Sequence, residues 1–397
     1  MASAFQFHVP TKLLFGPGSL AKLGDQALPG KRALIVTTGG KSVKANGYLA
    51  RVEAELDRAD VSHVLFDHIE PNPLRATVNE GGALAREQGC DVVVALGGGS
   101  VMDGGKAIAT MAANPAADGR AGDIWDYMKG GTAKGLPISN GPLPLVCIPT
   151  TAGTGSEVDS GGIVSCEETD EKLRLGDPRL FPALAVVDPE LMLTVPATLT
   201  AYQGFDALFH NIECFISTAR SPMGDMVCRE GVRAAAEALP KVIADGSDLA
   251  ARTQMAWAST LGGYAMDASG TTGSHATEHA MSAHHHALPH GAGLIMISLA
   301  YHRHMIAAHA CDERYIELAH LMGDEAADAP EAFLAQLERL QRTCGMDGLK
   351  MSDWGLAPEE FDAIAENALS TTKVLFDHDP APLTHADVVA ILQESYR

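Results

Sequence analysis

The stretch Asp91-Val-Val-Val-Ala-Leu-Gly-Gly-Gly-Ser-Val-Met-Asp-Gly-Gly-Lys106 decides how the first half of the chain is interpreted. Its β-branched start predicts a buried strand over 91–96, and the residues 101–114 predict a helix behind it. Three glycines between them let a diphosphate approach the backbone, and the helix start offers free N–H groups. A tight turn without a ligand is the alternative, but three consecutive glycines make that choice costly in chain entropy. We therefore expect phosphate binding here, in a fold that differs in detail from the usual GxGxxG domain.

The alternation of strand and helix continues on both sides of this turn. Further strands are predicted at 32–38, 61–67, 143–148 and 183–187, and an extra β piece or hairpin at 5–15. Such alternation predicts a parallel, Rossmann-like sheet with helices on both faces. Helical periodicity then dominates at 201–217, 224–243, 249–268, 274–283, 292–309, 313–323, 330–344, 358–370 and 385–396. We therefore expect an α/β dinucleotide-binding domain at 1–196 and an all-helical metal-binding and substrate domain at 197–397.

Composition excludes several classes of protein. A chain of 397 residues favours two domains, and its formal net charge of -21 argues against nucleic acids and anionic membranes as partners. No apolar run approaches the roughly 20 residues that span a bilayer, and the N-terminus lacks the features of a signal peptide. The seven cysteines of the chain are scattered without a CxxC pair. This pattern predicts reduced thiols in a cytoplasmic protein.

Histidines at helical spacing indicate a metal site. His275 and His279 lie four residues apart, and His290 follows in a Pro-His-Gly context. Upstream, Asp206 and His210 repeat the four-residue spacing in an apolar background. These pairs supply one carboxylate and three imidazoles, with either His279 or His290 as the last ligand. Such a set without thiolate fits Fe(II) or Zn(II) and favours a catalytic site over a structural one.

Two further loops bear on the cofactor. The segment Pro149-Thr-Thr-Ala-Gly-Thr-Gly-Ser156 follows a predicted strand, where open α/β sheets bind ligands, and its hydroxyls suit ribose and amide contacts. A capped turn is the alternative for this loop. The turn from Thr37 to Ser42 has no acidic residue that would repel a 2′-phosphate. NADP is therefore permitted, with Lys41 as a candidate phosphate contact.

At this point the chain resembles the iron-containing (group III) alcohol dehydrogenase family over essentially its full length. The resemblance rests on the FGPGSL start, the Glu70-Pro-Asn-Pro73 segment, the ALGGGSxxDxxK turn, the PTTAGTGSEV loop, the VVDPEL segment, the GFDALxHxIE helix and the His-rich stretch. No single piece is specific, but the combination is. The implied architecture is that of dehydroquinate synthase, an α/β domain followed by an all-α domain.

Position by position, the resemblance implies ligands and cofactor contacts. The implied metal ligands are Asp206, His210, His275 and His290, and His279 is the additional active-site histidine. The implied cofactor-binding residues are Thr38, Gly39, Gly40, Ser42, Gly98, Gly99, Ser100, Asp103, Thr150, Thr151, Thr154, Lys172 and Leu191. The Gly39-Gly40 turn looks more like family members that use NADP than those that carry Asp for NAD.

One spacing departs from the family pattern. Family members commonly separate the first and last ligand histidines by 14 positions, whereas His275 and His290 are 15 apart. The intervening loop, which holds His284 to His286, is thus slightly longer. We expect these three histidines at a pocket rim or in solvent.

The resemblance implies a metal-dependent NAD(P) alcohol dehydrogenase or aldehyde reductase of the homodimeric or larger kind. Hydride would pass between nicotinamide C4 and a metal-bound alcohol or aldehyde, with proton exchange through His279, water or the ribose hydroxyl. A hydroxyacid-oxoacid transhydrogenase is an alternative. A dehydroquinate synthase-like lyase is disfavoured, because 202–211 and 271–293 contain no Lys or Arg for a polyanionic substrate. Phe205, Phe209, Met266 and Met281 are candidates for an apolar substrate pocket or for core.

Overall fold

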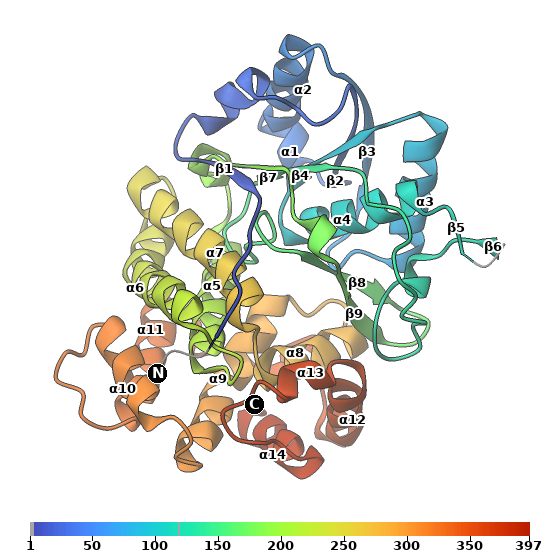
Figure 1. Ribbon diagram of the computed structural model, residues 1–397. Helices are drawn as coiled ribbons and strands as arrows, with labels where there is room; N and C mark the ends of the chain where they lie inside the picture. Colours follow the sequence, from blue (N-terminus) through green and yellow to red (C-terminus); the bar gives the residue numbers. More distant parts are fainter. Residues whose placement is uncertain (1–3, 118–119) are drawn as a thin grey trace. The chain divides into compact units, whose positions relative to one another are not determined.

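The computed structural model describes residues 4–117 and 120–397 (Figure 1). The described chain forms two compact units. The N-terminal unit contains residues 8–151 and 156–193, and the C-terminal unit contains 4–7, 152–155 and 194–397. The loop 149–156 is therefore divided between the two units.

A six-stranded parallel sheet forms the centre of the N-terminal unit, in the order β1-β10-β7-β4-β2-β3. Its strands are β1 (Lys12–Phe15), β2 (Arg32–Thr38), β3 (Ser62–Ile69), β4 (Val92–Gly97), β7 (Leu145–Pro149) and β10 (Leu184–Val187). The strands predicted at 32–38, 61–67, 91–96, 143–148 and 183–187 are present within two residues of their expected bounds. The two-residue strands β5 (Ala116–Ala117) and β6 (Arg120–Ala121) pair with each other away from this sheet.

Alternating side chains of each strand pack into two separate cores, because successive residues of a strand face opposite sides of a sheet. Val93 and Ala95 of β4 join the core beneath α3 (Arg75–Glu87) and α4 (Gly99–Ala113). Val92, Val94 and Leu96 join the core on the other face, beneath α1 (Ser42–Ala45), α2 (Tyr48–Arg58) and the short helix η1 (Ser19–Asp25). Figure 1 shows α2 and α4 on opposite sides of the sheet. Burial on both faces explains the unbroken apolar run of β4.

The β structure differs from the sequence-based expectation in one main feature. An antiparallel hairpin, β8 (Gly161–Cys166) and β9 (Glu171–Gly176), was not predicted. Two glycines open β8, and β9 mixes Glu, Lys and Arg with only two leucines, so the sequence signal for a strand is weak in both. At the start of the chain, β1 is a single strand parallel to β10, so it is the extra β piece, and not the hairpin, of the two alternatives expected at 5–15.

Helices build the C-terminal unit around one large apolar core. They are α5 (Ala197–Ile216), α6 (Pro222–Ala244), α7 (Leu249–Ser269), α8 (Gly273–His284), α9 (His290–Ala307), α10 (Asp312–Leu321), α11 (Glu331–Thr343), α12 (Phe361–Thr371), α13 (Lys373–Phe376) and α14 (His385–Ser395). The helix α5 is nearly all buried and packs against α6, α7 and α9. Phe205, Phe209 and Met281 lie fully in this core, so they are not pocket-lining residues.

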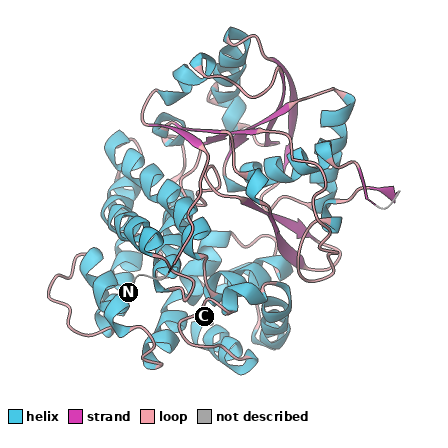
Figure 2. Cartoon of the chain, viewed as in Figure 1, coloured by secondary structure: helices cyan, strands magenta, loops and turns pink. Residues whose placement is uncertain are grey.

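The fold prediction is confirmed: a parallel α/β unit is followed by a helical unit. Figure 2 shows the described strands, in magenta, confined to the N-terminal unit. Among the described residues, no helix is both long and apolar enough to cross a membrane.

Candidate metal centre and glycine-rich turn

Three helices of the C-terminal unit supply the predicted metal ligands. The helix α5 carries Asp206 and His210 one turn apart, so both side chains lie on one face. The helix α8 carries His275 and His279 at the same spacing, and α9 begins at His290. Four of these five residues are buried, and His290 is partly exposed.

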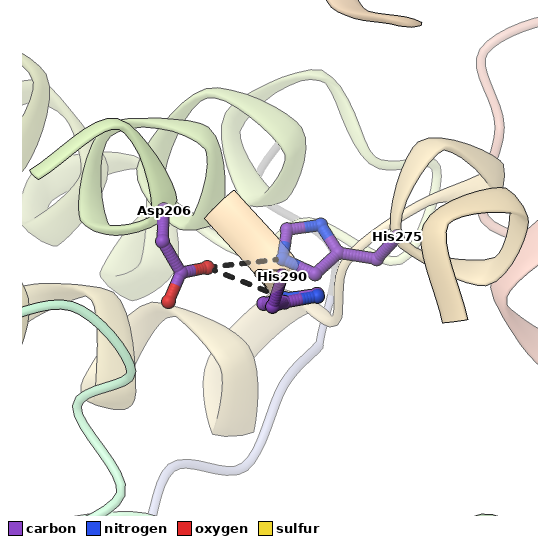
Figure 3. Close-up of side chains that lie close together, drawn as sticks. All are labelled: Asp206, His275 and His290. Atoms are coloured by element: carbon purple, nitrogen blue, oxygen red, sulfur yellow. Dashed lines mark ion pairs between the residues drawn. The ribbon is translucent and has the colours of Figure 1, made fainter. Parts of the chain in front are cut away.

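Asp206 is the point on which the imidazoles converge (Figure 3). Its Oδ1 atom lies 3.7 Å from Nε2 of His275 and 3.5 Å from Nε2 of His290. These three residues form a group whose potential ligand atoms all lie within 4.8 Å of one another. His210 lies beside this group: its Nδ1 is 3.5 Å from the same Oδ1, and its ring stacks on that of His275 at 4.5 Å.

Oxygen acceptors hold the Nδ1 atom of each of these imidazoles. Glu213 accepts from His275 at 2.7 Å, Glu278 is bonded to His290, and the carbonyl of Gly153 lies 3.3 Å from Nδ1 of His210. In His275 and His290, a proton fixed on Nδ1 leaves Nε2, the atom that faces Asp206, as the lone-pair atom, which is how metal-binding histidines are oriented in proteins. Neither Asp206 Oδ1 nor His275 Nε2 makes a hydrogen bond with any described residue. The arrangement therefore fits a divalent cation.

Electrostatics favour a cation at the same place. Burial alone would raise the pKa of Asp206, but the facing imidazoles, chiefly His210 and His290, bring it well below its usual value. Burial lowers the pKa of His275, but Glu213 and Asp206 outweigh this effect and raise it to about 10. His210 has its pKa lowered to about 4, mainly by burial. Without a metal, a proton on His275 thus balances buried carboxylates, a role that a metal ion fills better.

Sequence reasoning missed Glu213, Glu278 and Gly153 as parts of this centre. Glu213 lies seven residues after Asp206, hence on the same face of α5, and this spacing is a signal that was available. A Cβ added to Gly153 would lie 3.2 Å from Asp206 Oδ2 and 3.1 Å from the Gln203 backbone oxygen. Glycine therefore allows the loop to approach the carboxylate closely, a contact that only the tertiary structure reveals.

Three of the four remaining histidines of the His-rich stretch have contacts or exposure away from the metal group. His284 lies at the end of α8, with Nδ1 3.0 Å from the carbonyl oxygen of Ala280. His285 pairs with Glu360 at 3.1 Å, and His286 is exposed. His279 is buried beside the metal group, with its ring 5.4 Å from that of His290. Of these four, only His279 is placed to act at the centre.

In the N-terminal unit, the glycine-rich turn joins β4 to α4. Gly98 is the N-cap of α4 and provides no side chain to cap the helix. Val101 and Met102 donate their N–H groups to the Gly98 carbonyl, so the N–H groups of Gly99 and Ser100 are left at the helix start. A Cβ on Gly98 would lie 3.0 Å from Oγ1 of Thr151, so this turn and the loop after β7 are in contact. Such a helix start is suited to an anionic group.

A buried polar cluster connects α4, which follows this turn, to the segment 156–163. Asp103 accepts from Ser156 Oγ at 2.6 Å and from the N–H of Ile163 at 3.0 Å. Burial raises the pKa of Asp103 to about 6, although Lys106 opposes that shift. The fully buried Lys106 donates to Asp159 at 2.5 Å and to the Gly161 carbonyl at 2.6 Å. One carboxylate oxygen of Asp103 thus holds Ser156 of the loop after β7, and the other holds Ile163 of the hairpin.

The turn after β2 has a neighbour that the sequence did not reveal. Thr38 accepts the N–H of Gly40, whereas Gly39, Gly40, Lys41 and Ser42 are exposed. A Cβ on Gly39 would lie 3.2 Å from the backbone oxygen of Asp67, at the end of β3. The Asp67 carboxylate pairs with Lys44, and this hydrogen bond lowers the pKa of Asp67. An acid is therefore present near the turn, but a lysine neutralises it.

The other predicted cofactor residues lie in several settings. Thr150 is buried and donates its N–H to Gly97. Thr154 belongs to the segment 152–155 of the C-terminal unit. Lys172 is buried on β9 opposite Ser165, and Leu191 lies fully buried in a short helix, Pro189–Met192, after β10.

Comparisons with known proteins agree with the fold. A family model described as iron-containing alcohol dehydrogenase matches residues 10–189, and the C-terminal model of the same family matches 200–396. Alcohol dehydrogenase 4 of Saccharomyces cerevisiae is 35% identical over 399 residues, covering 100% of both chains. The 1,3-propanediol dehydrogenase of Klebsiella pneumoniae is 32% identical and covers 99% of both. An archaeal alcohol dehydrogenase from a Red Sea brine pool, solved with NZQ bound, superposes with a TM-score of 0.93 at 31% identity, covering 100% of both.

Proposed function

The chain belongs to the iron-containing alcohol dehydrogenase family and is a metal-dependent oxidoreductase of alcohols, and we propose that Asp206, His210, His275 and His290 hold its metal ion. One observation carries this proposal. The Asp206 oxygen that lacks a hydrogen bond faces Nε2 of His275 and His290, while Glu213 and Glu278 hold the Nδ1 atoms of these rings. The donor set suits Fe(II), which the family name indicates, and also Zn(II).

A bound metal ion would supply a Lewis acid that polarises the oxygen of the alcohol or aldehyde. The protein's own contribution is to hold the ligands at fixed orientation before substrate arrives, through Glu213, Glu278 and the Gly153 carbonyl. His279 is proposed as the residue that exchanges the hydroxyl proton of the substrate. It is buried within reach of the metal group, on the face of α8 that carries His275.

A nicotinamide cofactor would supply or accept the hydride, and we propose that the domain of residues 1–196 binds it. The open helix start at Gly99 and Ser100 is the site for its diphosphate, beside Thr151. NADP is proposed over NAD, although relatives include a probable NADH-dependent butanol dehydrogenase of Bacillus subtilis. Support comes from the exposed Gly39–Ser42 turn, with Lys41 in it, and from Lys44, which neutralises Asp67.

The remaining functional proposals are coarser. The substrate is proposed to be a small, largely uncharged alcohol or aldehyde, because the segments 202–211 and 271–293 around the centre carry no Lys or Arg. A cytoplasmic location and a homodimer or larger assembly are proposed as well. All seven cysteines are free thiols, in keeping with a reducing compartment.

The test is turnover of NADPH and NADH with a panel of aldehydes under anaerobic conditions. Chelator-stripped protein would receive Fe(II), Zn(II) or no metal, and His275→Ala and Asp206→Ala serve as inactive references. Metal-dependent turnover that both variants lose is the expected result. Absence of turnover with any metal, with cofactor that never leaves the protein, would instead favour the hydroxyacid-oxoacid transhydrogenase.

A further inference from the structure

A chain of hydrogen bonds runs from the metal group to a buried carboxyl group late in the sequence. His275 contacts Glu213, whose Oε2 lies 2.8 Å from Oγ1 of Thr272. That hydroxyl lies 2.8 Å from the hydroxyl of Tyr301, which in turn lies 2.6 Å from Oδ1 of Asp379. All five residues are buried in the C-terminal unit. Asp379 follows α13 and is distant from the metal group in sequence, yet it ends a continuous path to His275.

The number of protons on this path limits its protonation state. Three oxygen–oxygen contacts join Asp379, Tyr301, Thr272 and Glu213, and each requires one proton. The two hydroxyl groups supply only two. Glu213 already accepts from the N–H of Thr272 and from His275, so it is the accepting end of the path. The third proton therefore belongs on Asp379.

The surroundings of Asp379 favour this neutral form. Its Oδ1 atom accepts the N–H of Gly273 at 2.9 Å besides contacting Tyr301. Its Oδ2 atom makes no hydrogen bond with any described residue, which is costly for a buried carboxylate and cheaper for a carboxylic acid. The titratable groups that act on it come from three helices, Glu213 of α5, Tyr301 of α9 and Tyr315 of α10, and none of them is a cation. Burial raises the pKa of Asp379 to about 7, although the contacts with Tyr301 and Gly273 oppose that shift.

We propose that Asp379 is a positioning residue that acts as a neutral carboxylic acid. Its proton is donated to Tyr301, Tyr301 donates to Thr272, and Thr272 donates to Glu213, which then holds the Nδ1–H of His275. This inference rests on the proposed role of His275 as a metal ligand. It adds a residue that supports this ligand indirectly, through Tyr301, Thr272 and Glu213.

The test measures release of Zn(II) from the loaded full-length protein into an excess of chromogenic chelator, from pH 6.5 to 9. At pH 6.5, Asp379→Ala and Tyr301→Phe should release the ion about tenfold faster than the unmodified protein. This is the lower end of the roughly 10- to 100-fold loss of metal affinity that follows when a residue supporting a ligand is removed. Asp379→Asn should stay within about twofold, because an amide can donate to Tyr301 as the acid does. As the pH rises, the unmodified protein should approach Asp379→Ala, and Asp379→Asn should not.

Asp377→Asn, the same change at an exposed carboxylate paired with Lys373, is the matched control and should change nothing. Equal release from Asp379→Asn and Asp379→Ala at pH 6.5, or a ratio of unmodified protein to Asp379→Asn that stays constant with pH, would overturn the proposal. If Asp379→Ala fails to fold, the pH dependence of the release rate of the unmodified protein relative to Asp379→Asn still tests the proposal. If His275→Ala retains Zn(II) at the unmodified rate, the proposed metal site itself is wrong, whatever Asp379 does.

Discussion

Replacing Asp206 by Asn is the sharpest test of the metal centre, because it removes one charge and keeps the shape. Asp206 is the only carboxylate among the proposed ligands, and its Oδ1 faces the imidazoles of His210, His275 and His290. The amide oxygen of Asn can still reach the ion as a neutral ligand. The measured change therefore reports the charge of one carboxylate.

The magnitude follows from Coulomb's law. A carboxylate oxygen binds such an ion at about 2.1 Å. For charges of -1 and +2 at that distance the attraction is about 4 kcal/mol even at the dielectric constant of water, which corresponds to roughly a thousandfold in affinity. Burial of the Asp206 side chain makes this a lower bound.

Competition of Asp206→Asn and the unmodified protein for Zn(II) against a chelator of known affinity measures this difference directly. The exposed Asp377→Asn variant is the control for the chemical change itself. Metal affinity of Asp206→Asn within tenfold of the unmodified protein would refute the assignment of Asp206 as a ligand. A loss of a thousandfold or more, in a metal-free variant that still unfolds cooperatively, is the expected result.

Three other predictions address the cofactor, the buried acid and the polar cluster. Gly39→Asp should lower the kcat/KM ratio of NADPH to NADH about tenfold by repelling the 2′-phosphate, and Gly39→Ala, which adds size without charge, should not. In the metal-free protein Asp379 has a folded-state pKa of about 7 against an unfolded value of 3.8, so its contribution to stability is complete below pH 3.8 and lost as the pH rises through 7. Urea unfolding should show that the unmodified protein loses about 2 kcal/mol more than Asp379→Asn between pH 5 and 7, and equal losses would contradict the raised pKa. Lys106→Met should lower the free energy of unfolding by about 3–5 kcal/mol, because it leaves buried Asp159 without its cation, and a loss below 1 kcal/mol would show that water reaches this cluster.

The fold could be predicted from sequence wherever burial was uniform. The strand β4 is covered on both faces and has an unbroken apolar run, and α5 to α9 show apolar positions at helical spacing. The hairpin β8–β9 escaped because its partners are polar: Glu171 accepts from Thr132 and Thr169, and Lys172 is buried beside it. Such strands are stabilised by specific partners elsewhere in the chain, which a pattern of hydrophobicity does not record.

Sequence reasoning likewise found some residues of the site and missed others. Spacing of four residues was sufficient to single out Asp206, His210, His275 and His279, because helix geometry relates them locally. Sequence reasoning did not identify Glu278 as the support of His290, or the approach of Gly153 to Asp206, because both depend on how separate segments pack. The neutralised Asp67 beside the Gly39 turn is another case, since β3 brings it there from a distance in sequence.

The supports of the centre cross between helices, and this explains why a longer loop is tolerated. Glu213 on α5 holds His275 on α8, while Glu278 on α8 holds His290 on α9. The packing of α5 and α8 against α9 therefore fixes each ligand together with its support. The segment between α8 and α9 makes neither contact. One residue more between His275 and His290 than the family commonly has thus lengthens only that connection, and His290 remains at the start of α9, where its Nε2 faces Asp206.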